Sequence, residues 1–235
     1  MGPGTSYGDL FRRDEAALLH DVHVGIVTDL NDPKSLGRVK VKFPWMPRAE
    51  ETAVWARIAT LMAGGDRGTW FIPEVDDEVL VAFIAGDPAS PVVLGGMWNG
   101  AQTPPETMDG AGNNDIRSVT SRAGHKLTFD DTAGQERVEI TTQGGHTVTL
   151  DDAAGGTITI AHSNGAKIEI DTSGSVKVTA NARVTVDAPA QVNVSTGMMN
   201  VDAAMAKFSG VVKCETLITN AVVSSSYTPG AGNVW

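Results

Sequence analysis

Adjacent carboxylates are the residues of this sequence whose type and spacing most directly suggest chemistry. Asp130-Asp131 and Asp151-Asp152 could bind calcium, or could act as the acid and base that cleave a glycan. Each pair directly follows a short apolar segment and precedes a glycine, and aspartate in that position commonly starts a turn. Turn formation is the better explanation, so we expect no catalytic residue here.

Histidines are a second set of candidate ligands, and they stand at His20, His23, His125, His146 and His162. One histidine from each of three chains could hold an ion on a shared axis. His146 and His162, however, lie in glycine-containing spacers, which favours ordinary surface turns. We therefore expect no metal ion and no cofactor.

A basic stripe at Arg38, Lys40 and Lys42 could contact nucleic acid. Residues 1–114 carry 9 Lys and Arg against 16 Asp and Glu, and the whole chain has a net charge of −10. Affinity for nucleic acid comes mainly from cations that meet phosphates. The charge favours a solvated strand face or a protein contact, and we expect no nucleic-acid partner.

A single cysteine, Cys214, excludes a disulfide within the chain and favours synthesis in the reducing cytosol. It is expected to be a buried small residue or a thiol on an assembly axis. The start of the chain, MGPGTSYGDLFRR, lacks the apolar segment of a secretory signal, and no run of about 18 apolar residues could span a membrane. We expect synthesis in the cytoplasm without a signal peptide.

Strand patterns begin after residues 1–21, which are expected to form an arm, with residues 9–20 either a short helix or flexible. The segment GRVKVKFP (37–44) alternates strictly, with Val39, Val41 and Phe43 on one face. About six strands are expected, at residues 22–29, 37–44, 53–62, 68–73, 77–84 and 91–98. A small closed barrel over residues 22–98 would remove the exposed edges of these strands. Residues 99–114 contain Pro104-Pro105 and three glycines, and are predicted to be a linker.

After the linker, an apolar–polar–apolar triplet occurs eight times, at successive steps of 11, 10, 10, 10, 8, 8 and 8 residues. Turn-forming spacers separate the triplets, and all eight central residues are polar. Val or Ile occupies 13 of the 16 flanking positions. These positions are Leu127, Phe129, Val138, Ile140, Val148, Leu150, Ile158, Ile160, Ile168, Ile170, Val176, Val178, Val184, Val186, Val192 and Val194.

Each triplet is predicted to be a very short strand with two inward-pointing residues, which cannot fold alone. A coil of a single-chain β-solenoid commonly needs about 20 residues or more, whereas this repeat has 8 to 10. The shorter period suits one face of a prism whose other faces come from other chains. We therefore predict an intertwined homotrimer, a triple-stranded β-helix over residues 115–223, with the sixteen flanking residues in its core.

Several spaced motifs resemble the central spike proteins of contractile injection systems, namely phage baseplate assembly protein V, the VgrG spikes of type VI secretion and the spikes of extracellular systems. The motifs are GRVKVKFPW (37–45), VWARIAT (54–60), WFIPEVDDEVLVAFIAGDPASPVVLGGMWN (70–99) and Pro104-Pro105, followed by the repeat. The family usually has glycine where Asp76 stands, which we interpret as a tolerated turn variant. The ending SYTPGAGNVW (226–235) also resembles the end of such spikes.

The resemblance implies an all-β protein in which an oligonucleotide/oligosaccharide-binding (OB) barrel sits on a hub and a trimeric β-prism needle pierces a target envelope. The 21 residues before the first strand leave no room for a hub domain, so the hub is expected to be a separate protein. The linker stands where some phage spikes carry a cell-wall-degrading insert, and no enzymatic activity is expected. A tip-docking segment is expected over residues 224–235, with Tyr227, Val234 and Trp235 contacting a proline-alanine-alanine-arginine (PAAR) type tip protein.

Other functions stay open on the sequence alone. The alternative is an OB-fold module that binds nucleic acid or glycan, joined to a single-chain β-solenoid. A glycan-processing enzyme would need a groove with paired carboxylates, and a trimeric adhesin would normally need a secretion signal.

Overall fold

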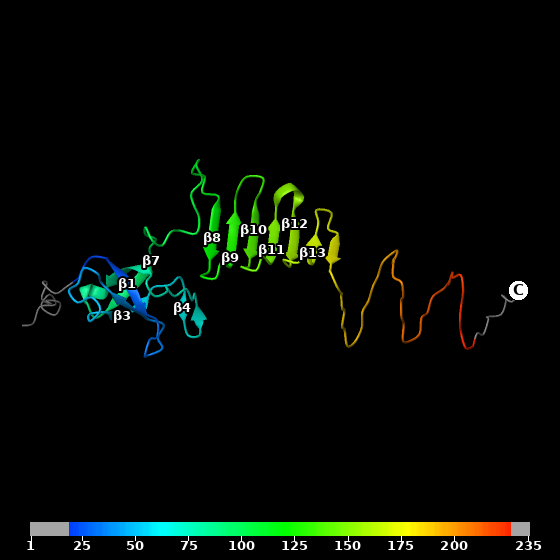
Figure 1. The fold of residues 1–235 in the computed structure, drawn as a ribbon, viewed down its shortest axis with the longest axis horizontal. Helices are drawn as coiled ribbons and strands as arrows, with labels where there is room; N and C mark the ends of the chain where they lie inside the picture. The colour runs from blue at the N-terminus through cyan, green and yellow to red at the C-terminus, as the bar shows by residue number, and fades with distance from the viewer. Residues whose placement is uncertain (1–18, 227–235) are drawn as a thin grey trace, which may run out of the picture. The chain divides into compact units, whose positions relative to one another are not determined.

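The computed structural model describes residues 19–226, and the regular elements in this range are β-strands, apart from two short 3-10 turns (Figure 1). Of the predicted arm only residues 19–21 are described, and the backbone N–H of Leu19 donates to the carbonyl of Gly86 at 2.9 Å. The predicted tip-docking residues Tyr227, Val234 and Trp235 lie outside the described residues. The chain divides after Arg183 into two units.

Five strands of the first unit close into a barrel; the sequence predicts a closed barrel, but one of about six strands. They are β1 (His23–Asp29), β2 (Val39–Lys42), β3 (Val54–Ile58), β6 (Glu78–Phe83) and β7 (Pro91–Gly96). Their order is β1-β2-β3-β7-β6, and β1 pairs with β6 to complete the circle. All pairs are antiparallel except β3 with β7, which is parallel. A five-stranded barrel of short strands is typical of the OB fold.

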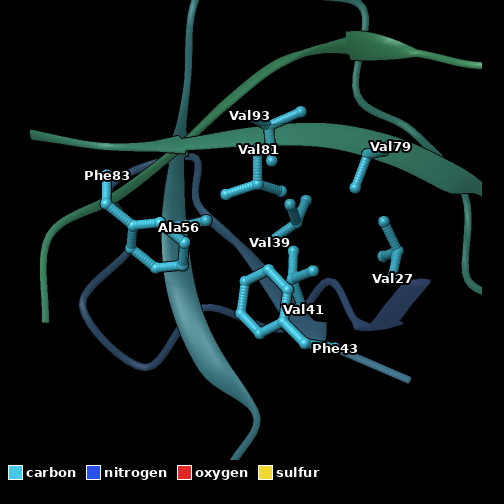
Figure 2. Packing of buried hydrophobic residues seen from close by; sticks show 9 residues of the cluster. All are labelled: Val27, Val39, Val41, Phe43, Ala56, Val79, Val81, Phe83 and Val93. Carbon is cyan, nitrogen blue, oxygen red and sulfur yellow. The ribbon is translucent and has the colours of Figure 1, made fainter. Parts of the chain in front are cut away.

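The interior of the barrel is apolar and well packed. Val39, Val41 and Phe43 are at most 2% exposed, so the alternation in GRVKVKFP is confirmed as a strand with one buried face. Phe43 and Phe83 pack with ring centroids 5.5 Å apart. Figure 2 shows the side chains of the barrel strands turned toward one another; the nine are Val27, Val39, Val41, Phe43, Ala56, Val79, Val81, Phe83 and Val93.

The strand predicted over residues 68–73 is wrong, and five strands rather than six form the barrel. Only a small hairpin of β4 (Ala63–Gly64) and β5 (Arg67–Gly68) is present, and residues 69–73 lie outside any strand. The adjacent side chains Trp70 and Phe71 are 76% and 72% exposed. Two adjacent apolar residues point to opposite faces of a strand, so the barrel interior could bury only one of them.

Two backbone positions of the barrel demand particular residues. A Cβ on Gly25 would lie 2.3 Å from Val41 Cγ1 and 3.3 Å from the carbonyl oxygen of Lys42, so β1 can approach β2 here only without a side chain. Asp76 has φ of 73°, and its N–H donates to the carbonyl of Val27 at 2.9 Å. This left-handed turn explains why glycine suits the position and why aspartate is tolerated.

The repeat forms a second sheet, a meander in which each strand pairs with the next. Its strands are β8 (Ile116–Thr120), β9 (Lys126–Asp130), β10 (Arg137–Thr141), β11 (Thr147–Asp151), β12 (Thr157–Ala161), β13 (Lys167–Ile170) and β14 (Val176–Thr179). All neighbours are antiparallel (Figure 1). The first six triplets lie one each on β9 to β14. A short 3-10 turn, η4 (Ala153–Gly155), joins β11 to β12, and another, η3 (Ile84–Gly86), follows β6.

The remaining described residues, 184–226, form no helix and no strand. The last two triplets, at 184–186 and 192–194, fall in this segment. No backbone-to-backbone hydrogen bond is made among residues 184–226, and every one of these residues is exposed.

Candidate functional site

The register of the meander gathers the predicted core residues onto one face of the sheet. Val138 stands opposite both Phe129 and Leu150, and Ile160 stands opposite both Val148 and Ile168. Twelve of the sixteen residues form two continuous rows across β9 to β14. One row is Phe129, Val138, Leu150, Ile158, Ile170 and Val176; the other is Leu127, Ile140, Val148, Ile160, Ile168 and Val178.

This apolar face is uncovered in the single chain. Phe129 and Leu150 are 44% exposed, Ile160 is 50% exposed and Val178 is 56% exposed, although each stands in a regular strand. A contiguous apolar surface of this extent marks an interaction site in a soluble protein. The other four predicted core residues, Val184, Val186, Val192 and Val194, are also exposed, but they lie in the strand-free segment and are not part of the two rows.

The opposite face of the sheet carries the polar central residues of the triplets. They form a row of Thr128, Glu139, Thr149, Thr159, Glu169 and Lys177. Glu169 stands opposite Lys177, a favourable cross-strand pair of opposite charges. Across β9 to β14 the flanking residues of the triplets thus lie on one face and their central residues on the other, because side chains alternate along each strand.

The paired aspartates organise turns at the end of the strands. Asp130 is 6% exposed; its Oδ1 accepts from the N–H of Thr132 at 3.1 Å, and its other oxygen lies 3.0 Å from Arg137. Hydrogen bonds from Thr132, aided by the charge of Arg137, lower the pKa of Asp130. Asp151 accepts from the N–H of Ala153 at 2.8 Å in the same manner. A carboxylate used in this way supports the hairpin rather than a catalytic groove.

The histidines of the sheet also bond to turns. His125 Nδ1 accepts from the N–H of Gln143 at 3.2 Å, His146 Nδ1 from that of Ser163 at 3.2 Å, and His162 Nδ1 from that of Asn164 at 3.1 Å. We assign the neutral tautomer with the proton on Nε2, because each Nδ1 is an acceptor. In that tautomer neither ring nitrogen is free to bind a metal. Within residues 19–226 no group of three or more histidine, cysteine or acidic side chains is placed to hold an ion.

Two residues of the basic stripe, Arg38 just before β2 and Lys42 at its end, are paired with acidic residues. Arg38 bonds to Asp32 through Nε at 3.0 Å and through a terminal nitrogen at 2.5 Å, and Lys42 lies 2.5 Å from Glu50. The bonds from Arg38 lower the pKa of Asp32 well below its usual range. Guanidinium and ammonium groups that are already paired are poorly suited to bind phosphates, which disfavours nucleic acid as a ligand.

An exposed apolar patch beside the barrel was not singled out by the sequence. Leu36, Leu61, Met62, Trp70 and Phe71 are between 50% and 96% exposed, and four of them, all but Leu61, line a hollow of about 560 Å³ with the β4–β5 hairpin. The exclusion of Trp70 and Phe71 from any strand creates this patch. Their adjacency in the sequence, which breaks the alternation expected of a barrel strand, was the available signal.

Comparison with known families assigns both parts of the chain. Residues 23–98 match the type VI secretion system/phage-baseplate injector OB domain. Residues 137–200 match the phage baseplate V C-terminal trimerisation domain. The chain belongs to the VgrG and baseplate V family of spike proteins. The trimerisation domain supports a homotrimer, and the resemblance drawn from the motifs of the sequence is confirmed.

Individual VgrG relatives agree with this assignment. The chain is 33% identical over 110 residues to the type VI secretion system spike protein VgrG3 of Vibrio cholerae, a match over 44% of this chain and 11% of the relative. It is 32% identical over 105 residues to VgrG1a of Pseudomonas aeruginosa, over 43% and 16% of the two chains. It is also 32% identical over 108 residues to the actin cross-linking toxin VgrG1 of Vibrio cholerae, over 43% and 10%. The matched region is thus less than a fifth of each of these VgrG proteins.

Across residues 19–226, the structure contains no helix with the length and hydrophobicity needed to cross a bilayer. The apolar face of the meander and the patch beside the barrel are both exposed in the single chain.

Proposed function

We propose that this chain is the trimeric spike of a contractile injection system or phage-tail-like baseplate, linking a hub to a tip protein and piercing the target envelope. The observation that carries the proposal is the uncovered apolar face of the meander. Its two rows run across six strands of a chain that matches a trimerisation domain. A sheet with one apolar face must pack that face against another layer.

Three copies of the meander supply the missing layers. If the apolar faces of three sheets turn toward a common axis, the twelve residues of each chain become the core of a triangular prism. Burial of each large apolar side chain contributes about 1.5–3 kcal/mol, which makes the interface a major part of the stability of the assembly. The strands then run across the prism, and the hairpin turns lie along its three corners.

The segment from residue 184 to 226 extends the needle by pairing between chains. Its backbone N–H and carbonyl groups have no backbone partners within the described residues, and unpaired backbone groups are costly to bury. Val184 and Val186, like Val192 and Val194, keep the alternation of a strand. Strands contributed by the two other copies satisfy both needs. The three chains are therefore intertwined over this segment, and each is fixed by the other two.

Interwoven chains suit a device that transmits force along one axis, because bending would break ladders in all three chains at once. Val and Ile, which dominate the core positions, also have stiff side chains that pack well in strands.

Two further parts of the chain are proposed to bind partners. The apolar patch of Leu36, Leu61, Met62, Trp70 and Phe71 is proposed to contact the hub, since exposed aromatic residues beside a hollow are typical of protein interfaces. The C-terminal residues Tyr227, Val234 and Trp235 are proposed to contact a PAAR-type tip protein. The chain is proposed to be made in the cytoplasm, to join the baseplate there, and to have no enzymatic activity of its own.

The mass of the purified chain in solution, measured by light scattering, tests the central claim. We expect three times the 24.6 kDa of one chain. A well-folded monomer would contradict the proposal, because the apolar face would then be stable without partners. A double substitution of Trp70 and Phe71 by serine is expected to leave this mass unchanged while removing the spike from assembled baseplates. Unaltered incorporation would exclude the patch as the hub contact.

A further inference from the structure

The two hairpin edges of the meander carry different side chains on the apolar side of the sheet. At one edge, two backbone hydrogen bonds extend the ladder by one residue. The N–H of Thr142 donates to the carbonyl of His146 at 2.9 Å, and that of His162 to the carbonyl of Ala166 at 2.8 Å. By alternation these residues lie on the same side as the apolar rows. We call His125, Thr142, His146 and His162 the histidine row. The rings of His146 and His162 are adjacent, with centroids 4.2 Å apart.

The other edge is acidic on the same side of the sheet. The N–H of Asp131 donates to the carbonyl of Asp115, and that of Asp152 to the carbonyl of Glu136, both at 2.9 Å. Asp115, Asp131, Glu136 and Asp152 therefore form the acidic row, adjacent to the row of Phe129, Val138 and Leu150. Within the described residues only Asp131 has a cationic partner, Arg117, which lies on the surface. Four neighbouring carboxylates repel one another and favour a partner with hydrogen-bond donors.

The histidine row has the donors that this acidic row lacks. His125 and His146 use Nδ1 to accept from the next hairpin turn, and His162 uses Nδ1 to accept from its own turn. Each imidazole thus keeps an Nε2–H that has no acceptor within residues 19–226. A hydrogen bond from such a donor to a carboxylate is stronger than one between neutral groups. His125 and Asp131 stand at the two ends of β9, and His146 and Asp152 stand at the two ends of β11. The histidine donors and the carboxylate acceptors therefore occur at the same positions along the stack of strands.

We propose that the histidine row of one copy docks on the acidic row of the next copy, with His125 and His146 donating through Nε2–H to the neighbouring Asp131 and Asp152. A rotation about an axis along the stack brings the histidine edge of each sheet against the acidic edge of the next sheet. The contact is of the head-to-tail kind, and a threefold rotation closes it into a ring. The inference rests on the trimer of the proposed function. It specifies which edges of neighbouring sheets meet and which strands face one another there.

An exchange of side chains between the two ends of β11 tests the pairing. His146→Asp places a carboxylate against the neighbour's Asp152, and Asp152→His places an imidazole against the neighbour's His146. Each single variant is expected to speed chain exchange between differently tagged trimers about tenfold or more, the scale of one charge-assisted bond per corner. The double variant His146→Asp/Asp152→His recreates a complementary pair, and its exchange rate is expected to return toward that of the natural chain.

Controls separate the pairing from local damage and from failure of the trimer itself. Ala123→Asp adds the same charge to an exposed hairpin tip outside the row, at a residue that makes no bond to a histidine within the described residues, and is expected to leave exchange unchanged. Loss of the bond between His146 and Ser163 alone would not be rescued by a change at residue 152. A double variant that exchanges as fast as the worse single variant, or single variants that exchange like the natural chain, would overturn the pairing while the trimer stands. A natural chain that is monomeric would overturn the proposed function.

Discussion

The barrel and the meander share the same alternation of apolar and polar residues, but they bury their apolar side chains to different extents. In the barrel, nine apolar side chains are at most 8% exposed, because five strands close on themselves around a single interior. In the meander, the strands pair equally regularly, yet residues such as Ile160 and Val178 stay half exposed. Regular pairing of strands and burial of the apolar face are therefore separate requirements. The barrel meets both within one chain, whereas the meander, which is an open sheet, meets only the first.

A polar side chain introduced into the apolar rows is expected to have the largest effect. Ile160→Asn is expected to abolish the trimer, because it places an amide in the core of all three chains. The unpaired polar group and the lost packing together cost on the order of 2–5 kcal/mol per copy. Thr159→Asn on the polar face of the same strand is the matched control and should stay trimeric. Light scattering measures both. A trimeric Ile160→Asn chain would mean that the apolar face is not the interface.

A methyl group at the closest approach of two barrel strands should have the next largest effect. Gly25→Ala would place Cβ 2.3 Å from Val41 Cγ1, so the free energy of unfolding of the barrel is expected to fall by about 1–3 kcal/mol. Denaturant unfolding followed by tryptophan fluorescence measures the change. Gly95→Ala is the control, since a Cβ there would meet nothing within 4 Å. Equal stability of the two variants would show that β1 can move away from β2 at no cost.

The pH dependence of the barrel should reveal the Asp32–Arg38 pair. The pKa of Asp32 is lowered by its bonds to Arg38, so the ionised form stabilises the folded state. That contribution is fully present above the unfolded pKa of about 4 and is lost progressively as the pH falls below it. Asp32→Asn is expected to lower Tm at neutral pH by less than Gly25→Ala does. The variant should also lose less stability than the natural chain between about pH 5 and 2, and parallel Tm profiles would contradict the assignment.

The left-handed turn at Asp76 should give the smallest change, and it is a gain. Asp76→Gly relieves a side chain held at φ of 73° and is expected to raise the free energy of unfolding of the barrel by about 0.5 kcal/mol. Asp76→Ala, which lacks the tolerance of aspartate for this conformation, should lower it. Both are measured by denaturant unfolding. If glycine and alanine behaved alike, the conformation of the turn would not explain the preference for glycine in the family.

Local patterns predicted much of this molecule. The strict alternation around Val39 and Val41 identified a strand with one buried face, and the triplets identified the strands β9 to β14 together with the residues on their apolar side. Such predictions succeed because alternation in a strand depends only on neighbouring residues. The strand predicted over residues 68–73 failed because apolar composition alone does not provide a pairing partner, and Trp70 and Phe71 find none.

The choice of partner for each strand was decided only in three dimensions. Triplets of the same apolar–polar–apolar pattern pair within the chain up to Thr179, while those at 184–186 and 192–194 make no backbone pairs among the described residues. The spacing of the triplets did not predict that boundary. The sequence alone also did not predict that histidines and carboxylates lie on opposite edges of the sheet, because this depends on the side on which each hairpin turns. Pairing and edge composition join residues far apart in the chain, so they follow from the register of the sheet rather than from any local period.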